Sequence, residues 1–191
     1  MKLVLFIASF LLSTTLITAS GSEPTSKTIN VTASSVGWKA SKVTGTHTGL
    51  INFKTGNLKF EGDILIGGEL VVDMTTINCT DLTGGGKGKL EGHLKSDDFF
   101  GVTNHPTSTI KFTKVTSRGT AGEYKITANI TIKNITKEIK FNANLKAGNG
   151  TASIKLDRSD FDIRYGSGSF FDNLGDKTIY DEFDLNVSLV F

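Results

Sequence analysis

The chain is dominated by an alternation of apolar and polar residues, which is typical of β-strands with one buried face. The alternation is clearest over residues 124–132, where every second residue is apolar and the residues between are polar. The same pattern runs through residues 139–147, 152–156 and 183–191. Weaker alternation predicts further strands over residues 28–33, 36–40, 45–55, 57–61, 69–75 and 107–116. The sequence therefore predicts an all-β domain.

Short segments rich in glycine and asparagine separate these strands and predict turns. They lie at residues 55–57, 118–119, 121–122, 134–137 and 148–150. Because only a few residues link the last four long strands, we expect these strands to be antiparallel neighbours. Closing such a sheet into a barrel removes its exposed edges and gives the apolar faces an interior to line. We therefore expect an antiparallel barrel of about eight strands.

Two segments depart from the alternation. Residues 87–100 carry Leu90, His93 and Leu94 at helical spacing, which predicts a short helix ending in Phe99-Phe100. Residues 167–177 predict a second helical turn or an ordered loop, and both segments are expected to lie across a barrel end. The glycine cluster at residues 84–88 lacks the spacing of a phosphate-binding loop, so we expect a flexible connector there.

The N-terminus has the order of a secretory signal peptide: Lys2, an apolar run over residues 3–16, then small residues. The run is shorter than the roughly 20 residues that cross a bilayer. We expect residues 1–20 to be removed on export and residues 21–191 to form one domain. Without Lys2 the chain has 20 basic residues (21 − 1) against 19 acidic ones, a net charge of about +1. That balance argues against a nucleic-acid partner.

Reactive chemistry is sparse in this sequence. Cys79 is the single cysteine, so no internal disulfide can form, and we expect a buried, unreactive thiol. The three histidines lack metal-site spacing, and we expect neither a metal nor another cofactor. Arg158 and Arg164 follow an apolar strand and offer two alternatives. They lie in a solvated turn with local ion pairs, or one faces the barrel mouth and holds a polar head group.

Several segments together resemble the YceI-like family of polyisoprenoid-binding, lipocalin-like proteins. They are Trp38 with residues 45–49 (GTHTG), residues 67–74 (GGELVVDM), residues 89–100 (KLEGHLKSDDFF), residues 130–133 (ITIK), Asp157-Arg158, and residues 174–176 (LGD). The resemblance implies an extended, eight-stranded, lipocalin-like barrel. It also implies a cavity for an isoprenoid or similar long-chain amphiphile, export to a bacterial periplasm, and no catalytic residues.

The favoured function is an exported carrier or reservoir, periplasmic or secreted, for an isoprenoid or fatty-acid-like lipid. We expect no stable insertion into a membrane, and a homodimer is an open alternative. The expected ligand-binding residues are apolar side chains inside the barrel with a few polar ones at its mouth: Trp38, His47, His93, Phe99, Phe100, Phe112, Ile126, Ile130, Phe141, Leu156, Arg158, Phe161, Arg164, Phe170, Leu185 and Val187.

Two other classes of function remain as alternatives. Phe191 ends the chain on an aromatic residue, as the last strands of outer-membrane barrels often do. Against a membrane barrel, the chain has only one Trp and three Tyr, and the polar strand faces carry lysines that suit a solvated exterior: Lys125, Lys133, Lys140 and Lys146. The second alternative is a hydrolytic enzyme in which an acid forms an acid–base pair with a histidine. The candidates are His47 or His93 with Asp73, Asp157 or Asp176.

Overall fold

The computed structural model describes residues 23–191, so the predicted signal peptide lies outside the described residues. The described chain is built mainly of strands, with one α-helix and two short 3₁₀ helices. They are β1 (Thr25–Thr28), β2 (Ser35–Lys42), β3 (Gly45–Glu61), β4 (Ile64–Cys79), α1 (Gly84–Lys95), β5 (Thr107–Ser117), β6 (Glu123–Ile132), β7 (Ile135–Lys146), β8 (Asn149–Asp157), η1 (Arg158–Phe161), η2 (Gly175–Lys177) and β9 (Ile179–Val190).

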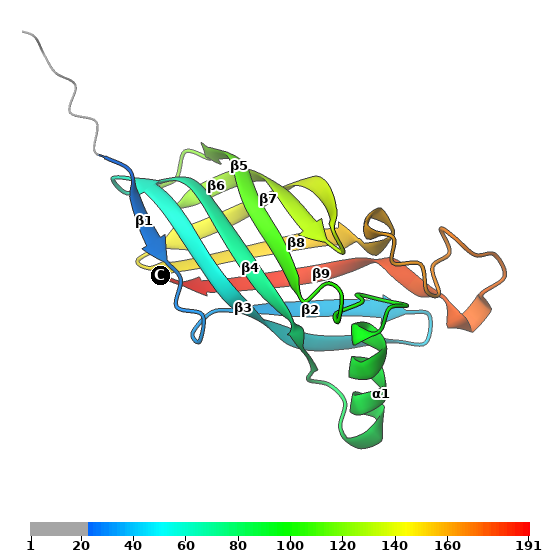
Figure 1. The fold of residues 1–191 in the computed structure, drawn as a ribbon. Coiled ribbons are helices and arrows are strands. Elements are labelled where there is room, and N and C mark those ends of the chain that lie inside the picture. Colours follow the sequence, from blue (N-terminus) through cyan, green and yellow to red (C-terminus); the bar gives the residue numbers. More distant parts are fainter. Residues whose placement is uncertain (1–22) are drawn as a thin grey trace, which may run out of the picture.

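The strands form a closed antiparallel barrel (Figure 1). Their order is β1-β3-β2-β9-β8-β7-β6-β5-β4, and a further pairing of β3 with β4 closes the ring. Strands β2 to β9 are therefore the eight strands of the barrel wall. β1 pairs with residues 57–60 of β3, beyond the residues of β3 that pair with β2. The predicted eight-stranded antiparallel barrel is confirmed, and β1 is an additional short strand.

The long strand β3 corrects one prediction. The expected turn at residues 55–57 is a β-bulge within a continuous strand, where the pairing with β4 shifts register between Phe53 and Thr55. The inward residues are Ile51 and Phe53 before the bulge and Leu58 after it, so the alternation changes parity there. Gly56 is required for close packing rather than for a turn, because an added Cβ would lie 2.8 Å from the Ile29 side chain.

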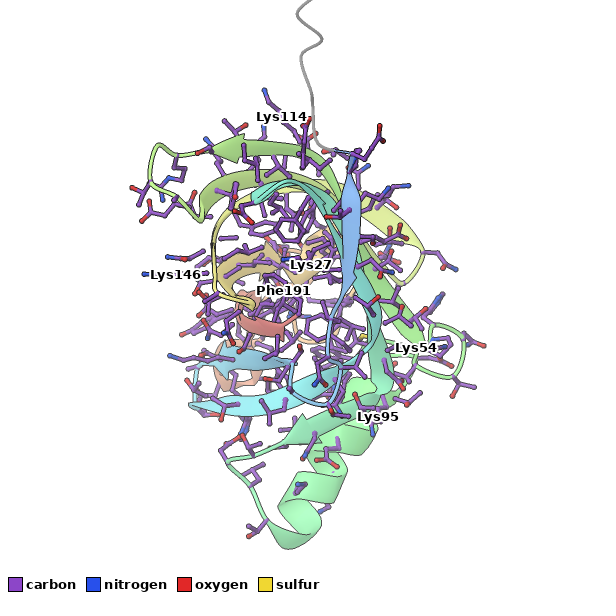
Figure 2. The ribbon with its side chains drawn as sticks, turned by 90° about the vertical axis from the view of Figure 1, so that its left-hand side faces the viewer. Lys27, Lys54, Lys95, Lys114, Lys146 and Phe191 are labelled. Carbon is purple, nitrogen blue, oxygen red and sulfur yellow. The ribbon has the colours of Figure 1, made fainter. Side chains whose placement is uncertain are left out.

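Apolar side chains point into the barrel, as Figure 2 shows from the end at which β9 finishes. At this end the ring of Phe191 stacks on that of Phe60 with 5.6 Å between centroids, and the Lys27 ammonium lies 4.8 Å from the Phe60 centroid. We call this the closed end. Lys54 and Lys146 point outward from the barrel wall (Figure 2). The exposed lysines on the polar strand faces follow from the same period-two geometry that turns the apolar residues inward.

The helix α1 and the segment after β8 lie at the opposite end, which we call the α1 end (Figure 1). The helix begins at Gly84, so residues 84–88 form its first turns and the prediction of a flexible connector was wrong. Contacts with β4 hold this glycine-rich turn: Lys87 Nζ donates to Asn78 Oδ1 (2.7 Å) and the Cys79 N–H donates to Glu91 Oε1 (2.8 Å). The helix ends at Lys95, so the Phe pair lies in the turn after it.

The segment over residues 167–177 is an ordered loop that ends in the 3₁₀ helix η2, in agreement with the predicted loop or helical turn. The other 3₁₀ helix, η1, was not predicted. Asp157 caps it, accepting hydrogen bonds from both the N–H (2.8 Å) and the hydroxyl (2.5 Å) of Ser159.

Within residues 23–191, no helix combines the length and the apolar character needed to span a bilayer.

Candidate binding site

The barrel encloses two adjacent apolar cavities. The inner cavity, about 80 Å³, lies toward the closed end and is lined by residues such as Leu58, Phe112 and Phe141. The outer cavity, about 130 Å³, lies toward the α1 end and includes Met74 and Phe100 in its wall. Five residues line both cavities: Val36, Val72, Ser108, Ile130 and Leu185. The interior is thus two chambers with a common wall.

A third cavity, which we call the mouth cavity, continues the row at the α1 end. Its volume is about 290 Å³, and it is more open to solvent. It shares Trp38, Ala40, Leu94, Phe99 and Ile179 with the outer cavity. The three cavities therefore form one row from the mouth to the closed end, each sharing wall residues with the next.

The structure places most of the expected ligand-binding residues on these walls. The inner cavity takes Phe112, Ile126, Ile130, Phe141, Leu185 and Val187. The outer cavity takes Trp38, Phe99, Phe100, Ile130, Arg158 and Leu185. The mouth cavity takes Trp38, His47, His93 and Phe99.

Four of the expected residues lie elsewhere. Leu156 and Phe161 are buried in the core, 4% and 1% exposed, but line none of the three cavities. Arg164 and Phe170 are exposed on the outer surface, with the guanidinium carbon 5.0 Å from the ring centroid.

The sequence reasoning missed the cavity wall contributed by β4. Leu70, Val72 and Met74 face the interior at period two and line the inner or the outer cavity. The same alternation that identified the strand could have identified them. Ile77 continues the wall only after a register shift in the pairing of β3 with β4, so its side could not be inferred by counting from Met74.

Trp38 and His93 line the mouth cavity from β2 and α1. The Trp38 indole packs across Gly49, where an added Cβ would collide with the ring and with the Asn78 carbonyl. The His93 ring lies 4.4 Å from the Tyr165 ring and 5.4 Å from the Phe99 ring, centroid to centroid. Trp38 Nε1 and His93 Nε2 are buried and have no hydrogen-bond partner among the described residues.

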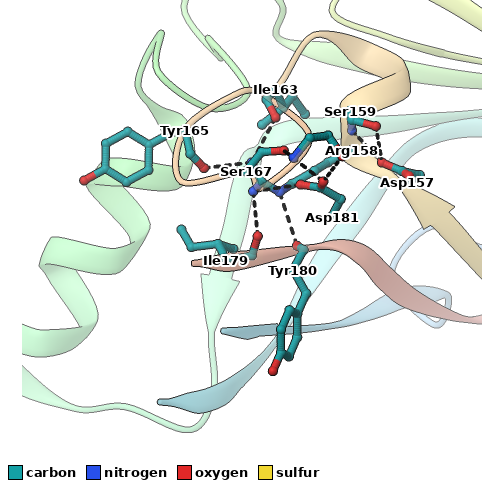
Figure 3. A network of polar contacts seen from close by, with 10 residues as sticks. Asp157, Arg158, Ser159, Ile163, Tyr165, Ser167, Ile179, Tyr180 and Asp181 are labelled. Atoms are coloured by element: carbon teal, nitrogen blue, oxygen red, sulfur yellow. Dashed lines mark hydrogen bonds and ion pairs between the residues drawn. The ribbon is translucent and has the colours of Figure 1, made fainter. Parts of the chain in front are cut away.

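Arg158 lies at the boundary between the outer cavity and the loop after β8 (Figure 3). Its Nε donates to the Tyr180 carbonyl (3.2 Å), and Nη1 donates to those of Ile163 (2.9 Å) and Tyr165 (2.8 Å). Its Nη2 donates to the Ile179 carbonyl (2.9 Å) and pairs with Asp181 Oδ1 (3.0 Å). Four of the five N–H groups of the guanidinium thus donate to carbonyls, and the ion pair with Asp181 accompanies them. Four bonds to carbonyls of the chain leave Arg158 little donor capacity for a ligand head group, although it lines the outer cavity as expected.

The carboxylate of Asp181 ties this network to the loop. Its Oδ2 accepts hydrogen bonds from the hydroxyls of Ser167 (2.8 Å) and Ser169 (2.7 Å) (Figure 3). Burial lowers the pKa of Arg158 below its usual range, and the negative charge of Asp181 opposes that shift. Arg164 pairs with Asp162 on the exposed side of the loop, which agrees with the solvated-turn alternative for that residue.

A second polar network lies beside the mouth, where β3 meets the end of β4. Asp81 accepts hydrogen bonds from the Thr48 N–H (2.8 Å), from His47 Nδ1 (2.8 Å) and from the Cys79 thiol (3.2 Å). The Thr48 bond, followed by that from His47, lowers the pKa of Asp81 from 3.8 to about 2. The Cys79 thiol is fully buried, as predicted.

The histidine–carboxylate pair is not one that the enzyme alternative proposed. His47 pairs with Asp81, whereas Asp73 accepts hydrogen bonds from Thr75 and Asp157 accepts them from Ser159. Asp176 lies within the exposed 3₁₀ helix η2. No cluster of three or more potential metal ligands occurs in the described range, residues 23–191.

Comparison with known proteins gives a family match over nearly the whole barrel. The model of one family, described as the YceI-like domain, matches residues 27–191. A UPF0312 protein of Pseudomonas aeruginosa is 34% identical over 88 residues, covering 40% of this chain and 44% of the relative. A UPF0312 protein of Pectobacterium carotovorum is 42% identical over 53 residues, covering 28% and 27%. The chain spans less than half of the length of these curated relatives.

Solved structures share the fold at low sequence identity. BcnA of Burkholderia cenocepacia superposes with a TM-score of 0.68 at 17% identity, covering 85% of this chain and 99% of that one. A polyisoprenoid binding domain from Saccharophagus degradans, described as implicated in plant cell wall breakdown, gives a TM-score of 0.57 at 14% identity, covering 85% and 95%. At such identities the likeness supports the shared barrel alone.

Proposed function

Because the chain belongs to the YceI-like family, we propose that it binds a long-chain isoprenoid or similar amphiphilic lipid inside its barrel, as a carrier or reservoir. The observation that carries this proposal is the row of three cavities from the mouth to the closed end. The binding named for the Saccharophagus degradans domain, which has the same fold, supports it.

The physical basis is burial of a long apolar tail. Each methylene removed from water contributes about 0.8 kcal/mol, so a long chain can bind tightly without specific polar contacts. A ten-residue strand spans roughly 33 Å, which is enough to enclose many carbons of an extended tail. A tail that occupies both apolar cavities must pass the shared wall, where Ser108 is the smallest side chain. Access past this wall therefore limits the length of tail that can enter.

Ser108 offers a direct test. Ser108→Leu adds apolar bulk at the wall between the two cavities, at a cost of about 1–3 kcal/mol of stability for overpacking. The matched control is Ser188→Leu, on the exposed face of β9. We expect native mass spectrometry of mildly purified protein to detect a lipid in the unaltered and Ser188→Leu chains, and less or none in Ser108→Leu.

Added polyprenyl lipid should raise the melting temperature of the unaltered chain and of Ser188→Leu by the same amount, and that of Ser108→Leu by less. Empty organic extracts from repeated preparations, together with no shift in melting temperature, would contradict lipid binding. Equal binding by both leucine variants would contradict the location of the tail.

The proposal includes export, to the periplasm or beyond the cell. Expression of the full chain in a bacterium should release the mature protein into the osmotic-shock fraction, with a mass that lacks about 20 N-terminal residues. Retention in detergent-extracted outer membranes, with gel mobility that changes on heating, would instead support the membrane-barrel alternative.

A further inference from the structure

The mouth cavity differs chemically from the two cavities behind it. No charged residue lines the inner cavity, and Arg158, which donates to four carbonyls of the chain, is the only one lining the outer cavity. The mouth cavity, in contrast, is lined by Lys42 at the end of β2 and Lys89 on α1, with Ser41, His47 and His93. Polarity therefore increases along the row, from the closed end to the mouth.

The charges on this mouth are of one sign. No aspartate or glutamate is among the residues that line the mouth cavity. Neither Lys42 nor Lys89 takes part in any of the eight ion pairs within residues 23–191. The nearby carboxylate of Asp81 is already engaged by His47, Thr48 and Cys79. The two ammonium groups thus leave an excess of positive charge at the opening.

Two buried polar atoms on the same wall lack partners. The indole nitrogen of Trp38 can only donate a hydrogen bond, and a buried donor without an acceptor is unfavourable. Trp38 Nε1 and His93 Nε2 both lack a partner among the described residues, and the histidine nitrogen donates or accepts according to its tautomer. A hydrogen-bonding group that enters the mouth cavity would relieve that cost.

We propose that the mouth cavity binds an anionic head group, of which a phosphate ester is the type, while the tail extends into the outer and inner cavities. This inference rests on the proposed lipid-binding function and adds the chemistry and orientation of the ligand. Lysine binds phosphate as a point charge, and Trp38, whose Nε1 donor has no partner, lines the same cavity. The stacked apolar rings of Phe60 and Phe191 at the closed end suit the end of the tail rather than the head group.

Trp38 also provides the measurement, because it is the single tryptophan of the chain. We expect its emission to change on titration with farnesyl phosphate and with farnesol, which share a tail and differ in the head group. The unaltered protein should prefer the phosphate by about tenfold, the size of effect that two partly solvated lysine contacts can give. The preference should fall as salt is added.

The charge-removing variant is Lys42→Gln/Lys89→Gln, and its matched control is Lys125→Gln/Lys146→Gln, which removes two exposed lysines from strands β6 and β7. The first double variant should lose most of the preference for the phosphate and bind farnesol as before. The control should retain the preference. Thermal unfolding of both variants verifies that the barrel is intact.

Each remaining outcome is decisive. Equal affinity of the unaltered protein for both ligands would overturn the head-group site and leave lipid binding in place. A preference that survives the loss of Lys42 and Lys89 would overturn its location. If inorganic phosphate displaced farnesyl phosphate at an equal concentration, the tail would contribute nothing to binding. That result would overturn the proposal that the ligand is an amphiphile. Binding of neither farnesyl ligand would overturn the proposed function itself.

Discussion

Replacing Arg158 with methionine should destabilise the barrel more than any exposed charge substitution. The arginine side chain is 3% exposed and engages four backbone carbonyls and the Asp181 carboxylate. Methionine has a similar length and no donor, so Arg158→Met leaves those acceptors and a carboxylate that is only 15% exposed without their partner. Removing one member of a buried ion pair costs about 3–5 kcal/mol, because the remaining charge stays unpaired. For a domain of this size, that loss lowers the melting temperature by on the order of 10 °C.

Urea denaturation followed by Trp38 fluorescence measures this free energy directly. The matched control is Arg164→Met, six positions along the same segment, where the arginine pairs with Asp162 in an exposed turn. We expect the control to change the free energy of unfolding by less than about 1 kcal/mol. Adding Asp181→Asn to Arg158→Met should recover part of the loss, since it removes the unpaired charge.

Two results would refute a stabilising role for the buried Arg158–Asp181 network. If Arg158→Met and Arg164→Met cost the same, or if Arg158→Met costs less than about 1 kcal/mol, the buried network contributes no more than a surface ion pair. If the second substitution at Asp181 is simply additive, the two side chains do not interact energetically.

Three further outcomes are expected in the same denaturation assay. The pKa of Asp81 is lowered from 3.8 to about 2, so its contribution to stability is present above pH 3.8 and is lost as the pH falls toward 2. Asp81→Asn should therefore make the free energy of unfolding less dependent on pH between these two values. Gly49→Ala should destabilise the fold and change Trp38 emission, because the new Cβ collides with the indole, whereas Gly85→Ala, with open space around it on α1, should stabilise it by about 0.5–1 kcal/mol. Phe161→Ala should cost about 3–5 kcal/mol but leave lipid affinity unchanged, because this ring is 1% exposed and lines no cavity of the row.

The fold could be predicted because alternation is a local property of the chain. Where a strand has no bulge, as in β6, every second residue points inward, so Ile126 and Ile130 could be assigned to the interior from the sequence alone. A bulge breaks this reasoning, since one extra residue reverses the side on which all later residues lie. In β5 the register shifts between Phe112 and Lys114, and Val115 rather than an even-numbered residue packs on the core beyond it.

The polar part of the site could not be predicted in the same way. Arg158 was correctly singled out as unusual, but two of its partners are the carbonyls of Ile179 and Tyr180, more than 20 residues away, which no local pattern connects to it. Asp81 was not considered as the partner of His47, because 34 residues separate them and only the pairing of β3 with β4 brings them together. Polar contacts between distant segments depend on the register in which the strands pair. The alternation of residues identifies a strand but does not fix the register with its neighbour.

Arg158 also connects stability to the shape of the α1 end. Its guanidinium carbon lies 5.6 Å from the centroid of the Phe99 ring, and Phe99 lines both the outer cavity and the mouth cavity. On its other side the same guanidinium holds the carbonyls of Ile163 and Tyr165, and Tyr165 in turn packs against His93 on α1. A guanidinium that donates to four carbonyls of the chain cannot turn toward an incoming anion without breaking some of those bonds. Arg158 therefore has a structural role at the α1 end, and in our proposal head-group selectivity comes instead from Lys42 and Lys89, which take part in no ion pair within residues 23–191.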